Sequence, residues 1–459
     1  MQFLINGVHQ FGDPGVFMSF EEAVDDLTLN FATFGFDLRP RANRKELLVD
    51  YVHVAPDEIQ ETGEYDLDGL FIRLGHAIDS IGAKRVVLDT IETLFAGFSQ
   101  SHLLRAELRR LFDWLRNKGV TAIVTGERGD GGMTRHGLEE YITDCVIMLD
   151  HRVREENATR RLRVVKYRGS AHGTNESPFF IDETGVSVLP LTSLGLQHGM
   201  SSGRLSTGVP DLDTMLGGKG YARGSSILVS GGPGTGKTSL AGYLADATCR
   251  RGELCLYFAF EESLAQIERN LHSIGLDLQR WLARGALHVH AARPTASGLE
   301  GHLSLMHRLI EEKKPRVVVV DPISNLISVG TTIEVRAMLA RLIDFMKVRQ
   351  ITGLFTSLSV DERSSETTDI GISSFMDTWL LLGNTEVNGE RIRSLNVLKS
   401  RGMAHSNQVR EFVLTRRGLS LLDVVRRQGR VLVGAERSAE GGGGVSVAMP
   451  KAARGSRRP

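Results

Sequence analysis

The sequence has no excess of charge of either sign and no long apolar run. It contains 55 basic and 55 acidic residues, so its overall charge points neither to nucleic acid nor to a membrane surface. No apolar stretch reaches the ~18 residues that a transmembrane helix needs, and no basic-then-apolar leader is visible at its start. We therefore expect a cytoplasmic protein that makes no membrane contact.

Cysteine is also scarce. The three cysteines, Cys145, Cys249 and Cys255, are widely spaced and form neither a disulfide framework nor a zinc-binding pattern. Cys145 and Cys255 lie in apolar strand-like runs, so we expect both to be buried packing residues. Isolated thiols of this kind fit a reducing compartment, which agrees with the expected cytoplasmic location.

The most specific motif is an octapeptide that fits the phosphate-binding loop, or P-loop, pattern G-x-x-x-x-G-K-[ST]. It runs from Gly231 to Thr238, after the strand-like run 227–230 and before the helix-like run 239–245. Its glycines let backbone N–H groups turn toward a phosphate, and the helix N-terminus adds partial positive charge. We expect Lys237 to contact the β- and γ-phosphates of ATP. The predicted ATP-binding residues are Gly231, Gly232, Pro233, Gly234, Thr235, Gly236, Lys237, Thr238, Ser239 and Asp321.

An internal repeat indicates two homologous domains, because three segments recur in the same order at a spacing of about 235 residues. Each repeat alternates apolar strand-like runs with amphipathic helices, which predicts a mainly parallel sheet covered by helices on both faces. The fold class is therefore α/β. The matched segments are 16–22 with 256–262, 85–89 with 317–321, and 166–172 with 399–405.

The two repeats are not equivalent, because this sequence shows a P-loop in the second only. Residues 1–10 align with the helix that follows a P-loop, so we expect nucleotide binding in the second domain alone. A misassigned start codon, a truncated gene and a domain that has lost its nucleotide loop are the open explanations. The expected divisions are a first domain at 1–196, a linker at 197–205, a second domain at 206–425 and a basic, Gly-rich, disordered tail at 426–459.

Charged residues that follow predicted strands complete a candidate catalytic set in the second domain. Asp321 ends an apolar strand and fits the acidic residue that positions Mg²⁺. Glu261 and Glu262 end the strand after the P-loop helix, where either can accept a proton from a water or hydroxyl. Lys399 and Arg401 lie two positions apart, so both can project toward a γ-phosphate from a neighbouring subunit. The predicted Mg²⁺ ligands are Thr238, Asp321 and Glu262.

Each of these assignments has a structural alternative. Asp321 can instead cap a helix, the two glutamates can form a solvated acidic turn, and the two cations can form a basic strand edge that prevents pairing. The recurrence of the cation pair as Lys166 and Arg168 in the first repeat favours the functional interpretation.

In order, the motifs G-G-P-G-T-G-K-T, F-E-E-S, V-V-V-D-P and K-S-R-G-M-A-H resemble the double-domain RecA-like ATPases of the KaiC family. The segment 206–218 is similar to that family's lead-in to the P-loop, and the resemblance covers residues 1–425. It implies tandem RecA-like P-loop domains, two stacked hexameric rings with ATP at the subunit interfaces, and an autokinase in the second ring.

The resemblance also implies two adjacent phosphoacceptor hydroxyls before a late core strand. The matching pair is Ser373 and Ser374, with Glu261 as the general base and Glu262 in support. The first domain has Glu140 and Tyr141 at the aligned positions, so we expect no acceptor there. From the residues alone, the serine pair can also be the start of a helix, because serine is a good N-cap.

We therefore expect a serine/threonine autokinase and slow ATPase that acts as an oligomeric signalling switch, with signalling or clock proteins as partners. Two alternatives stay open: a RecA-like nucleic-acid-dependent ATPase, and a scaffold that uses ATP only to assemble. The loop 360–366 leans acidic, which disfavours a pore for nucleic acid. The arginines of the tail can bind nucleic acid non-specifically.

Overall fold

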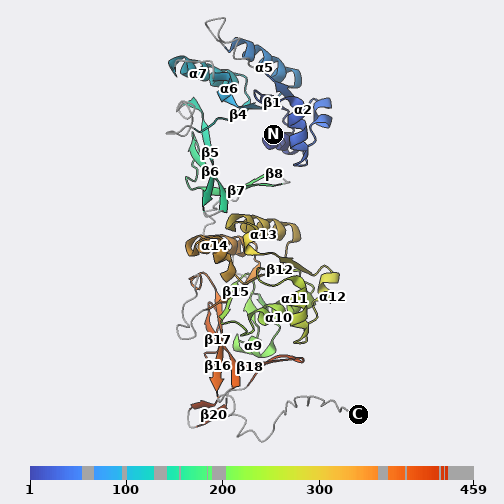
Figure 1. Ribbon diagram of the computed structural model, residues 1–459, viewed down its shortest axis with the longest axis vertical. Helices are drawn as coiled ribbons and strands as arrows, with labels where there is room; N and C mark the ends of the chain where they lie inside the picture. Colours follow the sequence, from blue (N-terminus) through green and yellow to red (C-terminus); the bar gives the residue numbers. More distant parts are fainter. Residues whose placement is uncertain are drawn as a thin grey trace, which may run out of the picture. The chain divides into compact units, whose positions relative to one another are not determined.

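The chain folds into two units, Met1–Thr192 (unit 1) and Ser193–Pro459 (unit 2). In both units, parallel strands that alternate with helices are followed by antiparallel strands, which confirms the predicted α/β class (Figure 1). No helix among the described residues is long and apolar enough to cross a membrane. The computed structural model describes residues 1–53, 67–95, 101–128, 142–154, 157–182, 185–188, 203–359, 371–387, 390–422, 425–427 and 430–432.

Unit 2 is built on one sheet, which in the described residues has nine strands in the order β13-β12-β14-β15-β11-β16-β17-β18-β19. The strands from β13 to β16 run parallel, and the last three are antiparallel. Every residue of β11 is buried, as expected of a central parallel strand. The strands are β11 (Ser226–Gly231), β12 (Cys255–Ala259), β13 (Leu287–Ala291), β14 (Val317–Asp321), β15 (Thr352–Leu358), β16 (Thr378–Val387), β17 (Glu390–Ser400), β18 (Arg410–Thr415) and β19 (Gly418–Leu421).

Most helices of unit 2 pack against this sheet, and α13 (Leu299–Lys313) packs against α14 (Thr332–Val348). Ser263 and Thr331 each close a capping box with the residue three positions later, which fixes where α11 and α14 begin. The helices are α9 (Pro210–Met215), α10 (Lys237–Arg250), α11 (Leu264–His272), α12 (Gln279–Ala283), α13 (Leu299–Lys313) and α14 (Thr332–Val348). The remaining short elements are β9 (Arg204–Leu205), β10 (Tyr221–Ala222), η1 (Pro294–Ala296) and η2 (Ser324–Val329).

The elements of unit 1 follow one another along the chain as in unit 2, but the described strands of unit 1 form two separate sheets. In the described residues their orders are β2-β1-β3-β4 and β5-β6-β7-β8. The strands are β1 (Gly15–Ser19), β2 (Leu47–Tyr51), β3 (Arg85–Asp89), β4 (Thr121–Val124), β5 (Cys145–Arg154), β6 (Asn157–Tyr167), β7 (Ser177–Asp182) and β8 (Gly185–Val188). The helices are α1 (Gln2–Phe11), α2 (Val24–Ala32), α3 (Arg39–Asn43), α5 (Asp68–Ile81), α6 (Ile91–Phe95) and α7 (Ser101–Asn117).

The predicted repeat is confirmed element by element. The three matched sequence segments correspond to β1 with β12, β3 with β14, and the end of β6 with the end of β17. The helix expected near residues 1–10 is α1, and its counterpart is α10. A left-handed glycine follows each of these helices, Gly12 with φ 68° and Gly252 with φ 77°, which other residues rarely adopt.

The predicted burial of Cys145 is wrong. Its thiol is exposed at the start of β5, whereas Cys249 and Cys255 are buried. In unit 2 the counterpart of Cys145 is Thr378, which is 2% exposed because β16 pairs with β11 there. Among the described residues, β5 pairs with β6 only, so nothing covers this edge in the same way.

Several predictions concern segments outside the described residues. The loop 360–366, Glu140, Tyr141, most of the predicted linker and residues 433–459 belong to this group. The first residues of the predicted tail are described, and there β20 (Val425–Arg427) pairs antiparallel with β21 (Arg430–Leu432). The domain boundaries and the character of the tail therefore stay predictions.

Candidate functional site

The P-loop connects β11 directly to α10, in the context that the sequence predicts. Gly234 has φ 72° and Gly236 has φ 101°, values that favour glycine. Gly236 is the N-cap of α10, and Lys237 is the first helical residue. The first N–H groups of α10 have no partner within the helix and are available to a phosphate oxygen.

Lys237 folds back into this loop. Its Nζ atom donates hydrogen bonds to the main-chain oxygens of Gly231 and Gly232, both at 2.8 Å. Burial lowers the pKa of its ammonium group, and the charges of Asp321 and Glu261 oppose that effect. The lysine therefore lies within electrostatic range of both predicted acidic residues.

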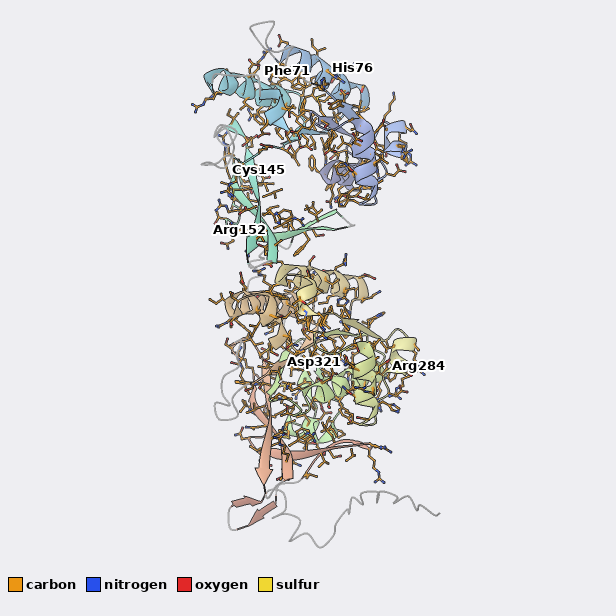
Figure 2. All side chains as sticks on the ribbon, in the orientation of Figure 1. Phe71, His76, Cys145, Arg152, Arg284 and Asp321 are labelled. Atoms are coloured by element: carbon orange, nitrogen blue, oxygen red, sulfur yellow. The ribbon has the colours of Figure 1, made fainter. Side chains whose placement is uncertain are left out.

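Asp321, which is labelled in Figure 2, is the last residue of β14. Its Oδ2 atom accepts a hydrogen bond from the Tyr257 hydroxyl at 2.5 Å, and its Oδ1 atom accepts one from Thr356. Burial, reinforced by Asp321, raises the pKa of Tyr257 well above its ordinary value, so the phenol keeps its proton and remains a donor. Two hydroxyl donors thus fix the carboxylate beside the P-loop.

The two glutamates after β12 differ in their surroundings. Glu261 is exposed. Glu262 accepts a hydrogen bond from Asn270 Nδ2 on its Oε1 atom at 3.0 Å, while its buried Oε2 atom has no hydrogen-bond partner among the described residues. Burial raises the pKa of Glu262, and the charges of Asp321 and Glu261 act in the same direction. A buried carboxylate oxygen without a partner is costly unless a cation or water binds it, so Glu262 fits the metal-ligand prediction.

Ser373 and Ser374 lie in a turn that precedes β16, so the alternative of a helix start is wrong. Lys399 Nζ donates to the main-chain oxygen of Ser373 at 2.8 Å, and Arg401 Nη2 donates to that of Ser374 at 2.9 Å. Burial, followed by the charge of Arg401, lowers the pKa of Lys399. The structure therefore brings both predicted cations to the predicted phosphoacceptors.

These two groups of site residues lie at opposite ends of β11. The turn at 373–377 is anchored beside the first residue of that strand, because Asp377 Oδ2 accepts from the main-chain N and the Oγ atom of Ser226, both at 2.9 Å. The P-loop follows the last residue, Gly231. A strand of six residues spans about 17 Å at its usual rise. One chain therefore does not bring Lys399 together with Lys237.

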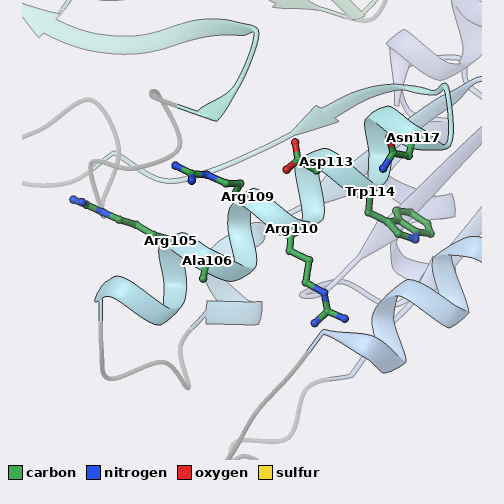
Figure 3. A pocket seen from close by; sticks show the side chains of 7 residues that line it. All are labelled: Arg105, Ala106, Arg109, Arg110, Asp113, Trp114 and Asn117. Carbon is green, nitrogen blue, oxygen red and sulfur yellow. The ribbon is translucent and has the colours of Figure 1, made fainter.

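The residues that orient the site are not among those that the sequence motifs predict. Tyr257 and Thr356 hold Asp321, and Asp377 holds the serine turn. The repeat pointed to Thr356, because a threonine recurs at the matching position of unit 1. There the Thr125 hydroxyl donates a hydrogen bond to Asp89 at 2.5 Å. A separate depression on α7 of unit 1, around Arg105, Arg109 and Trp114, contains none of the predicted site residues (Figure 3).

The comparisons with known proteins support the family resemblance that the order of the sequence motifs indicates. The family model described as "ATPase: KaiC" matches residues 1–193 and 205–425, most of the chain. The chain belongs to the KaiC family. Membership, together with the geometry of the P-loop, makes it a KaiC-like ATP-binding protein of the ATPase class.

Several KaiC proteins are similar over nearly the whole chain. The "Circadian clock protein KaiC2" of Synechocystis sp. is 54% identical over 439 residues, which cover 95% of this chain and 77% of that protein. The "Circadian clock oscillator protein KaiC" of Prochlorococcus marinus is 36% identical over 97% of this chain and 89% of its own length. The protein of the same name from Parathermosynechococcus lividus is 35% identical over 95% and 81%, respectively.

Proposed function

We propose that the chain is a serine autokinase and slow ATPase that acts as an oligomeric signalling switch. The observation that supports this proposal is that the P-loop and the turn of Ser373 and Ser374 lie at opposite ends of β11. Each of these two groups is one half of a complete site. ATP bound at Lys237 lies about one strand length, ~17 Å, from the serines of the same chain. Transfer therefore needs a neighbouring chain that places its own serine turn at this P-loop.

A head-to-tail arrangement of identical chains satisfies this requirement. Contacts between different surfaces of identical subunits close into a ring when the rotation permits. Every interface then pairs the P-loop of one chain with Lys399 and Arg401 of the next. The arrangement suits the homohexamer that the resemblance implies, and signalling or clock proteins in the cytoplasm as partners.

Each residue has a defined task at such an interface. Lys237 binds the β- and γ-phosphates, and Glu261 accepts the proton of the serine hydroxyl as its oxygen attacks the γ-phosphorus. The bond from the γ-phosphorus to the bridging oxygen breaks, ADP leaves with that oxygen, and phosphoserine forms. Lys399 and Arg401 stabilise the charge on the transferring group. ATP hydrolysis follows the same course with water in place of serine.

The donor set also fits Mg²⁺. The Thr238 hydroxyl and the carboxylates of Asp321 and Glu262 supply hard oxygen ligands, which this ion prefers. Among the described residues no group of three or more His, Cys, Asp or Glu side chains is arranged to hold a metal. Thr238, Asp321 and Glu262 would hold a bound Mg²⁺ ion, which would neutralise charge on the phosphates of ATP.

Phosphopeptide mapping after incubation with γ-labelled ATP tests the proposal. Label is expected on Ser373 and Ser374 and not on Tyr141. The double variant Ser373→Ala with Ser374→Ala should lose the label and still bind ATP, because neither side chain lies at the P-loop of its own chain. Undiminished labelling of this variant would contradict the assignment. Absent labelling with intact ATP hydrolysis would favour the ATPase without kinase activity.

A further inference from the structure

A buried carboxylate organises arginine side chains at the end of α10 that lies away from the P-loop. Asp246 is only 4% exposed, and aspartate is rarely buried unless it is paired. Its Oδ2 atom accepts a hydrogen bond from Arg250 Nε at 2.6 Å, and its Oδ1 atom accepts one from Arg280 Nη2 at 2.8 Å. The Trp281 indole N–H donates to the same Oδ1 atom at 2.7 Å. Asp246 therefore connects α10 with α12.

Trp281 also positions a third arginine. The guanidinium carbons of Arg280 and Arg284 lie 4.6 Å and 5.4 Å from the centre of its ring, within the range of cation–π attraction. These two arginines are four residues apart, and residues at this spacing lie on one side of a helix. Arg284 is the C-cap of α12 (Figure 2). We call Asp246, Arg250, Arg280, Trp281 and Arg284 the arginine cluster.

The arginine cluster carries a surplus of positive charge. Arg250 and Arg280 share the single carboxylate of Asp246, and Arg284 forms no ion pair among the described residues. Two positive charges are thus left without a counter-charge in the described part of the chain. All three arginines are exposed. Each guanidinium group has five N–H donors, and Asp246 accepts one from Arg250 and one from Arg280, so most of the donors remain available to a ligand.

Guanidinium groups arranged in this way match a phosphate group. An arginine fork binds two oxygen atoms of a phosphate at once, and such charge-assisted hydrogen bonds are stronger than neutral ones. A phosphate monoester carries roughly −1.5 to −2 charge at pH 7, close to the charge that the arginine cluster leaves uncompensated. Because Asp246 already holds Arg250 and Arg280, binding costs less side-chain entropy than at free surface arginines.

Two other anions fit the arginine cluster less well. A carboxylate of an acidic peptide brings a single negative charge, so it leaves one arginine charge unbalanced. Single-stranded nucleic acid typically stacks its bases on exposed aromatic rings. Trp281 is only 8% exposed and has Arg280 and Arg284 against its ring, so it offers no such surface. The observations therefore favour a phosphate dianion.

We propose that the arginine cluster is a binding site for a dianionic phosphate group, carried by phosphoserine in a polypeptide or present as inorganic phosphate. The site is distinct from the P-loop, because Asp246 follows Lys237 by nine residues on α10, which is about 14 Å along a helix. It does not involve the turn of Ser373 and Ser374. The inference is therefore independent of the proposed autokinase.

Binding of a dye-labelled peptide, measured by fluorescence anisotropy, tests this site in the intact chain. The probe is a neutral Gly/Ser peptide with one phosphoserine, and its matched control has serine at that position. Both are measured with the Lys237→Ala chain, in which the P-loop has lost its phosphate-binding amine. The phosphopeptide should bind roughly tenfold more tightly or better, because only its phosphate pairs with the arginines. Equal binding of the two peptides would overturn the proposal.

Inorganic phosphate, added as a competitor, distinguishes the two sources of the ligand. Displacement at a concentration near the dissociation constant of the phosphopeptide would assign the site to the phosphate group alone. Displacement only at concentrations roughly tenfold higher would show that the polypeptide around the phosphoserine contributes about 1.4 kcal/mol. Both results support a phosphate site. Stronger displacement by a single-stranded oligonucleotide than by unlabelled phosphopeptide would contradict it.

Arg284→Ala tests the arginine cluster without removing a hydrogen bond from Asp246, because Arg284 contacts Trp281 instead. In the same chain it should weaken phosphopeptide binding roughly tenfold. Arg284→Lys should recover only part of this loss, since lysine lacks the planar fork.

Arg293→Ala is the matched control for the loss of one exposed positive charge. Arg293 follows β13, and α12 precedes it, so the five residues of this strand separate the two by about 16 Å. Phosphopeptide binding should stay normal in this variant. Binding that is unchanged in Arg284→Ala, or weakened equally in Arg284→Ala and Arg293→Ala, would overturn the proposal.

Discussion

The Nζ atom of Lys399 donates a hydrogen bond to the main-chain oxygen of Ser373 at 2.8 Å. This contact holds the turn of Ser373 in its own chain, and the proposed mechanism gives the same lysine a second task at the phosphate of a neighbouring chain's ATP. A cation fixed to the acceptor turn places positive charge where the incoming γ-phosphate must arrive. Under the proposed autokinase mechanism, the same side chain would align acceptor and phosphate.

Replacing this lysine should therefore affect phosphoryl transfer more than nucleotide binding. Lys399→Ala is expected to lower the rate of serine phosphorylation roughly 10- to 100-fold, while the dissociation constant for ATP stays close to that of the unmodified chain. Lys313→Ala is the matched control, because among the described residues Lys313 forms an ion pair with its exposed neighbour Glu312. A weakened ATP affinity with normal phosphorylation at saturating ATP would contradict this role.

ATP binding is expected at unit 2 alone. Lys237→Ala removes the amine that the P-loop holds between two main-chain oxygens, so binding measured by calorimetry should be abolished. The unmodified chain should bind a single ATP. Stoichiometric binding that persists in the variant would show that unit 1 has a nucleotide site of its own.

Hybrid oligomers test whether sites form between chains. Lys237→Ala and Arg401→Ala are each expected to be inactive, since each removes one half of every site. Random mixing in equal amounts leaves about a quarter of the head-to-tail interfaces with both halves intact. About that fraction of turnover should return. No recovery in oligomers shown to be mixed would indicate that the cations act within one chain.

The environment of Glu262 predicts a pH dependence. Burial raises its pKa, so the carboxyl group takes up a proton at a higher pH than an ordinary glutamate. ATP turnover should fall as pH drops through this raised pKa, because the protonated group no longer binds a cation. Glu262→Gln should remove that acid limb and lower turnover at pH 7. Its melting temperature should not decrease, because the buried charge has been removed. An unchanged acid limb would contradict the assignment.

The P-loop could be predicted because its features are local. Gly236 before Lys237, between an apolar run and a helical one, determines strand, loop and helix without reference to distant residues. The alternation of apolar runs with amphipathic helices predicted parallel pairing, which is found between β1 and β3 and between β12 and β14. The repeat then matched strands in one half of the chain with strands in the other, as β1 with β12 and β3 with β14.

The rest depended on contacts between distant residues. The distance between Lys237 and Lys399 is set by the length and direction of β11, which no motif encodes. Cys145 has the apolar neighbours of a buried residue, yet its exposure depends on a strand partner that the sequence of β5 does not specify. The unpartnered Oε2 atom of Glu262 likewise results from packing around β12 and α11.

The position of β11 inside the sheet, between β15 and β16, also has a consequence for how unit 2 folds. Ser226 contacts Asp377, which lies 151 residues later, so this strand finds its neighbours only after a long stretch of chain has been ordered. Contacts between residues so far apart slow folding, because loop-closure entropy must be overcome before they form. A ligand that binds the folded and not the unfolded chain stabilises the folded state by mass action, so ATP should favour chains in which this closure is complete.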